Sequence, residues 1–314
     1  MEILFVSSGN NKFGLSPIVK NQGESLKKAG VNLDYFTIQS RGIFGYLKNM
    51  FRLRHMLKNN SYHLVHAHYS LSGIVALLAG SKPLVVSLMG SDIGKNKIWK
   101  WIVKVFSRYL WTVTIVKSKR MKQELGIRKS KIIPSGIDLE RFVCVDKEKA
   151  QKRIGFDRGK KHISFFADPN RPEKNIKLAK KAFDLIRVNS KQFNVIKDKP
   201  QELIPYYMNA TDVLLLTSFR EGSPNVIKEA MACNLPIVST DVGDVKEVIG
   251  KTKGCYISTF NPEDVLKKIE MALRFEKRTN GRNKIKHLDN DKIAIQIISV
   301  YKDILSRNTN TNLT

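Results

Sequence analysis

The sequence predicts an α/β protein built from two doubly wound parallel sheets. Short apolar runs alternate with helical patterns, which is typical of buried parallel strands joined by helical crossovers. This alternation starts again in the second half of the chain, and 314 residues suit two hydrophobic cores better than one. We therefore expect two Rossmann-like domains that face each other across a cleft.

The first half of the chain accounts for one sheet. Ser16 and Pro17 form a favoured helix start, because Ser can accept from a free amide and Pro has no amide to satisfy. Apolar runs predict strands at 3–8, 33–38, 63–68, 83–88 and 112–116, with helices from Pro17 and near 43–58, 70–80 and 97–110. A last strand near 131 leads into a charged stretch, so we place the first domain at 1–145.

The second half repeats the arrangement and predicts a domain at 146–290. Its strands are expected at 162–168, 194–198, 212–218, 235–241 and 254–258, and its helices at 174–187, 201–210, 224–233, around 245 and at 262–278. The remaining residues, 291–314, are expected to form a C-terminal helix with a polar tail.

The chain is strongly basic, with 55 Lys and Arg against 28 Asp and Glu and a formal net charge of +27. Such an excess indicates a polyanionic partner, which leaves a nucleic acid, an anionic membrane surface or phosphorylated substrates. Three scattered cysteines fit neither a zinc site nor a disulfide framework, which favours a reducing, cytoplasmic setting. The sequence shows neither a signal-peptide pattern nor an apolar stretch long enough to span a membrane.

The segment 218–244 carries the clearest chemical signal. It is predicted to run from a strand through a loop into a helix, so the loop lies at the carboxyl end of a parallel strand, where ligands of such sheets bind. Ser223 is expected to cap the helix, and Gly222 lets the backbone approach a ligand closely. The free amides of the first turn then form an anion site. Helical spacing places Lys228 in solvent and Glu229 at the border of the apolar face.

Two carboxylates, Glu221 and Glu229, flank this helix start. Either one alone is more simply a solvated surface residue, but together they suit a sugar nucleotide, with phosphates on amides and hydroxyls on carboxylates. The string from Glu221 to Gly243 resembles the E-x7-E segment of retaining glycosyltransferases of family 4, which have the GT-B fold. The resemblance implies that Glu229 binds the donor ribose and Glu221 the transferred sugar, without a metal or another cofactor.

Other segments resemble that family in the expected order. In FFADPNRPEKN (165–175), Arg171 and Lys174 would contact the donor diphosphate, together with the helix start that includes Gly222, Ser223, Asn225 and Val226. The amino-terminal domain would bind the acceptor, and the residues that the resemblance implies there are Gly14, His68, Ser91 and Asp92. His68 is also a candidate for an ordinary core histidine. Met89 stands where many members have histidine, and the chain is short between 187 and 201.

The basic residues are interleaved with aromatic ones in the first half of the chain. All three tryptophans, Trp99, Trp101 and Trp111, lie in a stretch whose residues from Lys95 to Gln123 include no acid, and residues 42–58 show the same mixture. Such amphipathic basic helices are typical of binding to an anionic membrane surface. The alternative is that the aromatic rings face the domain core and the cations extend into water. Nucleic acid is disfavoured because no known binding motif is present.

The sequence thus predicts a retaining glycosyltransferase that uses a nucleotide-sugar donor and a glycan or polyprenyl-linked acceptor, in surface polysaccharide or glycolipid synthesis. We expect it in the cytoplasm, peripheral at the inner face of the membrane. Two alternatives are a sugar-nucleotide epimerase of the same fold and an inactive homologue that binds glycans or polyanions. The sugar, the base, the linkage and the oligomeric state are not indicated.

Overall fold

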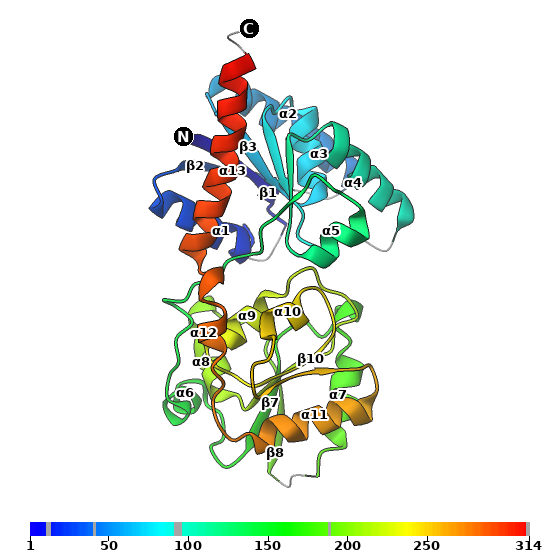
Figure 1. The fold of residues 1–314 in the computed structure, drawn as a ribbon, viewed down its shortest axis with the longest axis vertical. Helices are drawn as coiled ribbons and strands as arrows, with labels where there is room; N and C mark the ends of the chain where they lie inside the picture. Colours follow the sequence, from blue (N-terminus) through cyan, green and yellow to red (C-terminus); the bar gives the residue numbers. More distant parts are fainter. Residues whose placement is uncertain (11–13, 40–41, 91–95, 188–189, 312–314) are drawn as a thin grey trace. The chain divides into compact units, whose positions relative to one another are not determined.

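The computed structural model describes the chain except for residues 11–13, 40–41, 91–95, 188–189 and 312–314. The chain divides into two compact units. Unit 1 comprises Met1–Gly136 together with Asn290–Thr314, and unit 2 comprises Ile137–Asp289. Each unit contains a parallel sheet with helices on both faces, so the predicted α/β class with two sheets is confirmed (Figure 1).

The sheet of unit 1 has six strands in the order β2-β1-β3-β4-β5-β6. Their bounds are β1 Glu2–Ser8, β2 Asn32–Ile38, β3 Leu64–His68, β4 Leu84–Ser87, β5 Val113–Val116 and β6 Lys131–Ile132. The strands pair in parallel throughout the described part of this sheet, as expected from strands joined by helices. The five long apolar runs of the first half therefore all correspond to strands.

Two layers of helices cover this sheet. Helices α2, α3 and α4 lie on one face, and α1 and α13 on the other (Figure 1). The bounds are α1 Pro17–Lys28, α2 Gly42–Asn59, α3 Ser70–Leu78, α4 Lys97–Tyr109, α5 Lys119–Leu125 and α13 Asn290–Thr311. The first helix begins at Pro17 as predicted, although the Ser16 side chain makes no capping hydrogen bond. Helix α5, with Ser118 as its cap, was not predicted.

The C-terminal helix α13 completes unit 1. It packs against α1, and its Tyr301 hydroxyl lies 2.5 Å from Nδ1 of His66 in β3. An ion pair of 3.0 Å between Lys28 and Asp291 joins the same two helices. The predicted separate C-terminal segment is thus part of the first unit, because its apolar face is buried on a sheet built from the start of the chain.

The division between the units falls after Gly136, earlier than the expected boundary at 145. The segment between these positions is hydrogen-bonded to unit 2. The amide of Asn209 in that unit donates to the Val143 carbonyl at 2.8 Å, and its Oδ1 accepts from the Val145 amide at 3.0 Å. The charged stretch that follows is helix α6, Lys147–Ile154, capped by Asp146.

The sheet of unit 2 has five parallel strands in the order β11-β10-β9-β7-β8. These are β7 Lys161–Phe165, β8 Lys191–Val195, β9 Val213–Leu216, β10 Ile237–Thr240 and β11 Cys255–Ser258. The helices are α7 Ile176–Asp184, α8 Ile204–Ala210, α9 Asn225–Ala232, α10 Val245–Ile249, α11 Pro262–Arg274 and α12 Gly281–Lys284, with single 3₁₀ turns at Pro172–Lys174, Gln201–Leu203 and Lys286–Leu288. Because the strands are parallel, the loops after β7, β9 and β10 meet at one edge of the sheet.

Candidate functional site

The loops at the carboxyl edge of the unit 2 sheet are bonded to one another. The Thr217 hydroxyl, just after β9, donates to the carbonyl of Asn175 in the loop after β7 at 2.9 Å. The Thr240 hydroxyl, at the end of β10, donates to the Ser218 carbonyl at 2.7 Å. These side-chain bonds fix the relative positions of three loops, so residues that the sequence separates by about 70 positions form one surface.

An ion pair between Lys174 and Glu221 lies at the centre of this edge. The Lys174 Nζ is 2.6 Å from Oε1 of Glu221, and only 16% and 13% of the two side chains are exposed. The Ser218 hydroxyl donates to the same carboxylate oxygen at 2.7 Å. The residue implied for the diphosphate and the one implied for the sugar are therefore direct partners.

Arg171 lies in the loop after β7, beside this pair. Its Nε donates to the Glu173 carboxylate at 2.8 Å, and about half of its side chain is exposed. The structure thus brings Arg171 to the same edge as Lys174 but pairs it with a different carboxylate. An exposed guanidinium of this kind is free to rotate towards a ligand phosphate at little cost.

The helix that follows Glu221 begins differently from the prediction. Helix α9 starts at Asn225, with Pro224 as its cap residue, so the predicted cap at Ser223 is wrong. The Ser223 hydroxyl instead donates to Oδ2 of Asp244 at 2.5 Å and accepts from Nζ of Lys228 at 2.8 Å. The cap residue of α9 makes no side-chain hydrogen bond to the first turn.

The prediction that Lys228 is solvated is also wrong, because its side chain is fully buried. Helical spacing assumes that one face of a helix meets water, but α9 is packed against α8, α10 and α12. A Cβ on Gly281 of α12 would lie 2.8 Å from the Met231 sulfur, which shows how close that packing is. Burial lowers the pKa of the Lys228 ammonium to about 8, although the charges of Asp244 and Glu229 oppose that shift.

Glu229 is the residue after Lys228 on α9, and the pKa of its carboxyl group is shifted. Burial raises the pKa of its carboxyl to about 7, while the positive charges of Arg141 and Lys228 act in the opposite direction. The group therefore changes charge near neutral pH, which is common at functional sites. Arg141 was not predicted as a site residue, and its Nε is buried without a hydrogen-bond partner among the described residues.

Close backbone packing shapes the loop before α9. Gly243 has φ of +58°, and a Cβ there would lie 2.8 Å from the Gly222 carbonyl oxygen. A side chain at position 243 would thus push the loop away. On the first turn, Val226 is half-buried, and Oδ1 of Asn225 is buried without a hydrogen-bond partner in the described part of the chain.

The residues predicted on the acceptor side lie in unit 1. His68 ends β3, is fully buried and stacks on His66 at 4.5 Å between ring centroids. Burial, aided by the charge of Lys117, holds the pKa of His68 well below its usual range, and among the described residues neither ring nitrogen has a hydrogen-bond partner. This is the environment of a neutral core histidine.

The other acceptor-side residues are in loops. Gly14 has φ of +73°, which suits glycine, and a Cβ there would meet no atom within 4 Å. Met89, the residue in place of the usual histidine, is half-buried after β4. Ser91 and Asp92 lie outside the described residues.

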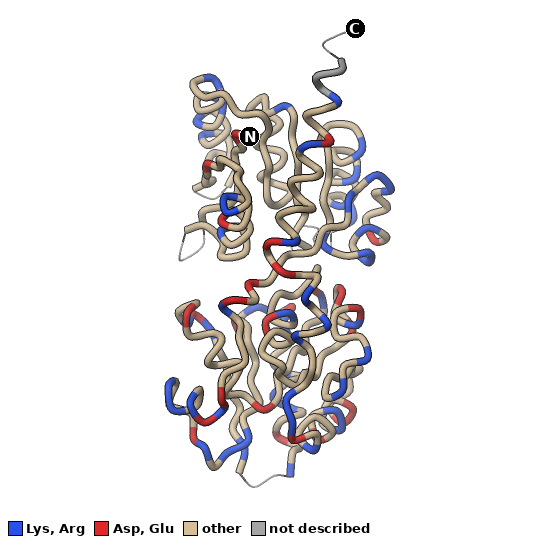
Figure 2. Tube along the Cα trace, turned by 60° about the vertical axis from the view of Figure 1, so that its left-hand side comes forward, with Lys and Arg blue, Asp and Glu red and all other residues tan. Residues whose placement is uncertain are grey.

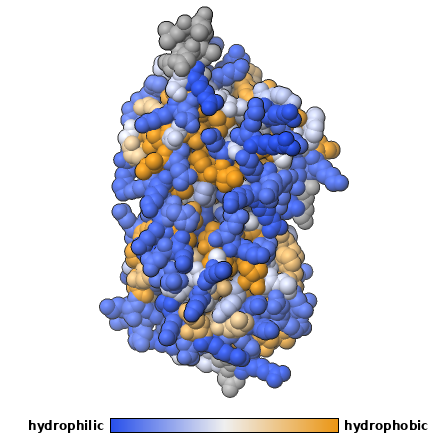
Figure 3. Space-filling model, viewed as in Figure 1, coloured by the Kyte–Doolittle hydropathy of each residue, from blue (hydrophilic) through white to orange (hydrophobic). Residues whose placement is uncertain are grey.

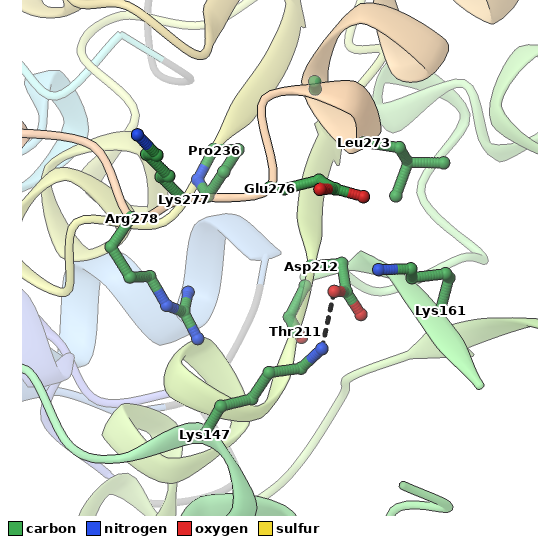
Figure 4. Close-up of a pocket in the computed structure, with 10 residues that line it drawn as sticks. Lys147, Lys161, Thr211, Asp212, Pro236, Leu273, Glu276, Lys277 and Arg278 are labelled. Atoms are coloured by element: carbon green, nitrogen blue, oxygen red, sulfur yellow. Dashed lines mark hydrogen bonds and ion pairs between the residues drawn. The ribbon is translucent and has the colours of Figure 1, made fainter. Parts of the chain in front are cut away.

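A pocket of about 280 Å³ lies elsewhere in unit 2, near the starts of β7 and β9 (Figure 4). The ammonium of Lys147 and the carboxylate of Asp212 are 2.6 Å apart in it, and the other Asp212 oxygen accepts from the His162 amide at 2.8 Å. Because these residues precede the strands, the pocket is at the opposite edge from the carboxyl-end loops. We interpret its ion pair as a structural link between α6 and the sheet.

The described residues show neither a cluster of His, Cys, Asp and Glu that could hold a metal ion nor a helix with the length and hydropathy needed to cross a membrane.

Two parallel α/β domains, the second with paired glutamates around a helix at its carboxyl edge, define a protein of the GT-B class. Residues 187–288 match the family model of glycosyl transferases group 1, and residues 15–114 match that of glycosyl transferase 4-like proteins. The two matches, one in each half of the chain, support a GT-B glycosyltransferase of the group 1 type, which its E-x7-E segment indicated.

Two glycosyltransferases from bacteria are similar to this chain in sequence. A Bacillus subtilis protein named as a teichuronic acid biosynthesis glycosyltransferase is 27% identical over 241 residues, which is 68% of this chain and 61% of the relative. The UDP-Gal:α-D-GlcNAc-diphosphoundecaprenol α-1,3-galactosyltransferase of Escherichia coli is 28% identical over 242 residues, 62% of each protein. The matches thus span about three fifths of these relatives.

Among solved structures, HepE of Anabaena in complex with UDP and glucose has a TM-score of 0.77 at 17% identity. The alignment covers 96% of this chain and 100% of that one. A likeness at this identity concerns the fold.

Proposed function

We propose that this protein transfers a sugar from a nucleotide-sugar donor to a glycan or polyprenyl-linked acceptor, with retention of the anomeric configuration. The observation that carries this proposal is the arrangement of the Lys174–Glu221 pair and Glu229 around the start of α9. Positive charge, free helix amides and two carboxylates at one sheet edge match the phosphates and hydroxyls of such a donor. The UDP bound by HepE and the UDP-Gal in the name of the E. coli relative support this ligand class.

The diphosphate would bind at the start of α9 and to Lys174. On donor binding, the ammonium would bond a phosphate oxygen in addition to Glu221, and Arg171 would turn from Glu173 to the same group. The backbone N–H groups of Gly222, Ser223, Asn225 and Val226 would donate to it, while Pro224 has none to offer. These groups stabilise the charge that develops on the leaving diphosphate, so the proposal requires no metal ion or other cofactor.

The chemical step would break the bond between the anomeric carbon and the diphosphate oxygen and form a bond from an acceptor oxygen to that carbon. The acceptor proton would pass to the departing diphosphate. Attack on the face that the leaving group vacates gives retention. Glu221, held by Lys174 and Ser218, would orient the sugar by accepting hydrogen bonds from its hydroxyls.

Glu229 would bind the ribose of the donor. A carboxylate can accept two hydroxyl hydrogen bonds, and one whose burial raises its pKa gains more from them than a solvated one does.

The proposal is tested with a panel of nucleotide sugars added to the protein in a thermal-shift assay. A donor that binds the folded state raises the melting temperature by mass action. The bound donor is then incubated with a lipid-linked acceptor, and NMR reports the anomeric configuration of the product. Conversion of the donor without acceptor would favour an epimerase, and a protein that binds no nucleotide sugar would be a non-catalytic homologue.

A membrane location is part of this proposal, at the inner face of the cell membrane. Helices α2, α3 and α4 contain no acidic residue, and in Figure 2 the acidic positions lie mainly in unit 2. Trp111 is in the core and Trp99 is packed against it, whereas Trp101 is 65% exposed. The core interpretation therefore holds for two of the three tryptophans.

Further large apolar side chains are exposed on the same layer, notably Phe44 at 88% and Phe51 on α2 and Ile98 on α4. Figure 3, a view of another face, shows hydrophilic residues over most of the surface with apolar residues in separate patches. Exposed aromatic rings among cations, without acids, suit the head-group region of an anionic bilayer. This layer would hold unit 1 against the membrane, where a polyprenyl-linked acceptor is found.

A further inference from the structure

Lys228 is a buried lysine, whereas most lysines lie on the protein surface. Its side chain lies wholly inside unit 2, on a short helix that other helices surround. Burying an ammonium group is costly unless hydrogen bonds compensate for the lost water. Its bonding partners therefore indicate what the residue does.

A chain of hydrogen bonds runs from Lys228 to two loops. The ammonium donates to the Ser223 hydroxyl at 2.8 Å, and that hydroxyl donates to Oδ2 of Asp244 at 2.5 Å. Ser223 precedes α9, and Asp244 follows β10, so the chain joins the second turn of the helix to the loops on either side of its start. Asp244 is itself 7% exposed, which keeps the network out of water.

The same two loops touch through their backbones. The φ of +58° at Gly243 and the small distance of its missing Cβ from the Gly222 carbonyl leave no room for a side chain between them. The hydrogen-bonded chain therefore lies next to a tight backbone contact. Together they determine where the loop 221–223 can lie.

This loop is anchored at both of its ends. Glu221 is held by Lys174 and by the Ser218 hydroxyl, at 2.6 and 2.7 Å. Ser223 is held by Lys228 and Asp244. Gly222 lies between the two anchors, at the position where the backbone leads into α9.

A role in stability alone does not explain a buried lysine at this position. Replacing both partners of a buried ion pair by apolar residues of similar volume is often neutral or stabilising, so packing alone does not require charges at these two positions. A buried cation is better explained by what it positions. Its charge also adds to the positive potential at the start of the helix.

We propose that Lys228 is a positioning residue that acts through Ser223 to hold the loop 221–223 in the conformation that binds the donor diphosphate. This inference rests on the function proposed above. It assigns to Lys228 no contact with the substrate.

Lys228→Met tests the inference in the full-length protein, with donor and acceptor KM, kcat and unfolding free energy as readouts. We expect the donor KM to rise about tenfold or more, the size of a lost charge-assisted hydrogen bond, with the acceptor KM unchanged. The unfolding free energy should fall, because Asp244 stays buried without its cation. A rise in donor KM with an unchanged acceptor KM, measured on folded protein, is therefore the readout that a merely structural role would not give. Lys246→Met on α10 is the matched control, because Lys246 is exposed.

Ser223→Ala provides a milder second variant, and it decides the question if Lys228→Met does not fold. It should raise the donor KM in the same way, and the double variant should be no worse than Lys228→Met, because both changes break one chain. Unchanged donor KM in folded Lys228→Met or in Ser223→Ala overturns the inference. If the wild-type protein binds no nucleotide sugar, the proposed function itself fails, which is a distinct result.

Discussion

The carboxyl edges of the two sheets differ in the charged side chains that lie there. In unit 2 the loops at this edge bring together Lys174, Glu221 and, behind them, Lys228, in ion pairs and hydrogen bonds that are mostly shielded from water. In unit 1 the corresponding end of β3 has two stacked, buried histidines that stay neutral. One buried cation, Lys117 just after β5, lies near these histidines, and many of the other positive charges of unit 1 lie on the helices that cover the sheet.

The difference favours unit 2 as the half that binds a charged ligand. Partly buried, opposite charges cost free energy because they lose contact with water. Their electrostatic interactions, with each other and with a charged ligand, are stronger where water is excluded. An edge without buried carboxylates, such as the one beside the two neutral histidines, suits an uncharged hydroxyl nucleophile, whereas cations on the outer helices suit a charged surface. The following experiments are ordered by the size of the expected effect.

The largest effect is expected from the ion pair in unit 2. Lys174→Met should lower kcat about 10²–10³-fold, because it removes a preorganised positive charge from the leaving diphosphate. Steady-state transfer assays measure this, and Lys177→Met, on the exposed side of α7, serves as the control. A variant that keeps wild-type kcat would show that the charged edge has another purpose.

Glu229→Ala should come next, with a loss in donor affinity. A hydrogen bond to a charged group contributes about 1.5–3 kcal/mol, so the dissociation constant should increase about 10- to 150-fold in calorimetry. Glu202→Ala, an exposed carboxylate of the same unit, should bind the donor like the wild type. Equal affinities for the two variants would remove Glu229 from the site.

The pH dependence of donor binding follows from the raised pKa of Glu229, about 7. Above that value the group is a carboxylate that accepts from ribose hydroxyls, and below it the proton must be lost on binding. Donor affinity should thus decrease as the pH falls through about 7 and level off above it. Glu229→Gln should lose this step in a calorimetric pH series, and retention of the step would attribute it to another group.

A smaller effect, on membrane binding, is expected from changes in the layer of helices α2, α3 and α4 of unit 1. Replacing Phe44 and Trp101 together by Ser should weaken pelleting with anionic vesicles several-fold, since apolar burial and cation attraction both contribute to interfacial binding. Transfer to a soluble acceptor analogue should not change. Phe260→Ser, an exposed aromatic residue of unit 2, is the control for loss of an aromatic ring in general. Equal pelleting with neutral and anionic vesicles would contradict a membrane role for the cations.

The smallest effect is expected from His68. Its ring nitrogens have no partner among the described residues, so His68→Leu removes no hydrogen bond, and kcat should stay within about twofold. A large loss of kcat, with the stability unchanged, would instead make His68 part of the acceptor site.

Much of the fold could be predicted from the sequence, because apolar runs and helical spacing are local signals. The exceptions have long-range causes. Helix α13 joins unit 1 because Tyr301 meets His66, a pairing between residues 235 positions apart. Short helices such as α5 and α12 give too few turns for a periodic signal.

The candidate site was predictable in part for the same reason. The string around Glu221 and Glu229 is contiguous, so its motif could be recognised, whereas the partners of Ser223 could not. Helical spacing placed Lys228 in water, since no local pattern reveals that α8, α10 and α12 surround its helix. Asp244 and Arg141 lie in other loops, and their charges affect the pKa values of Lys228 and Glu229 on α9. The sequence alone does not show that these loops meet the helix.

Amide hydrogen exchange can locate the donor, which we propose binds at the carboxyl edge of unit 2. Exchange is measured with and without the nucleotide sugar that raises the melting temperature most. We predict slower exchange in residues 217–226, where the loop and the start of α9 would meet the diphosphate. Protection confined to unit 1, or to the pocket around Asp212, would contradict the account.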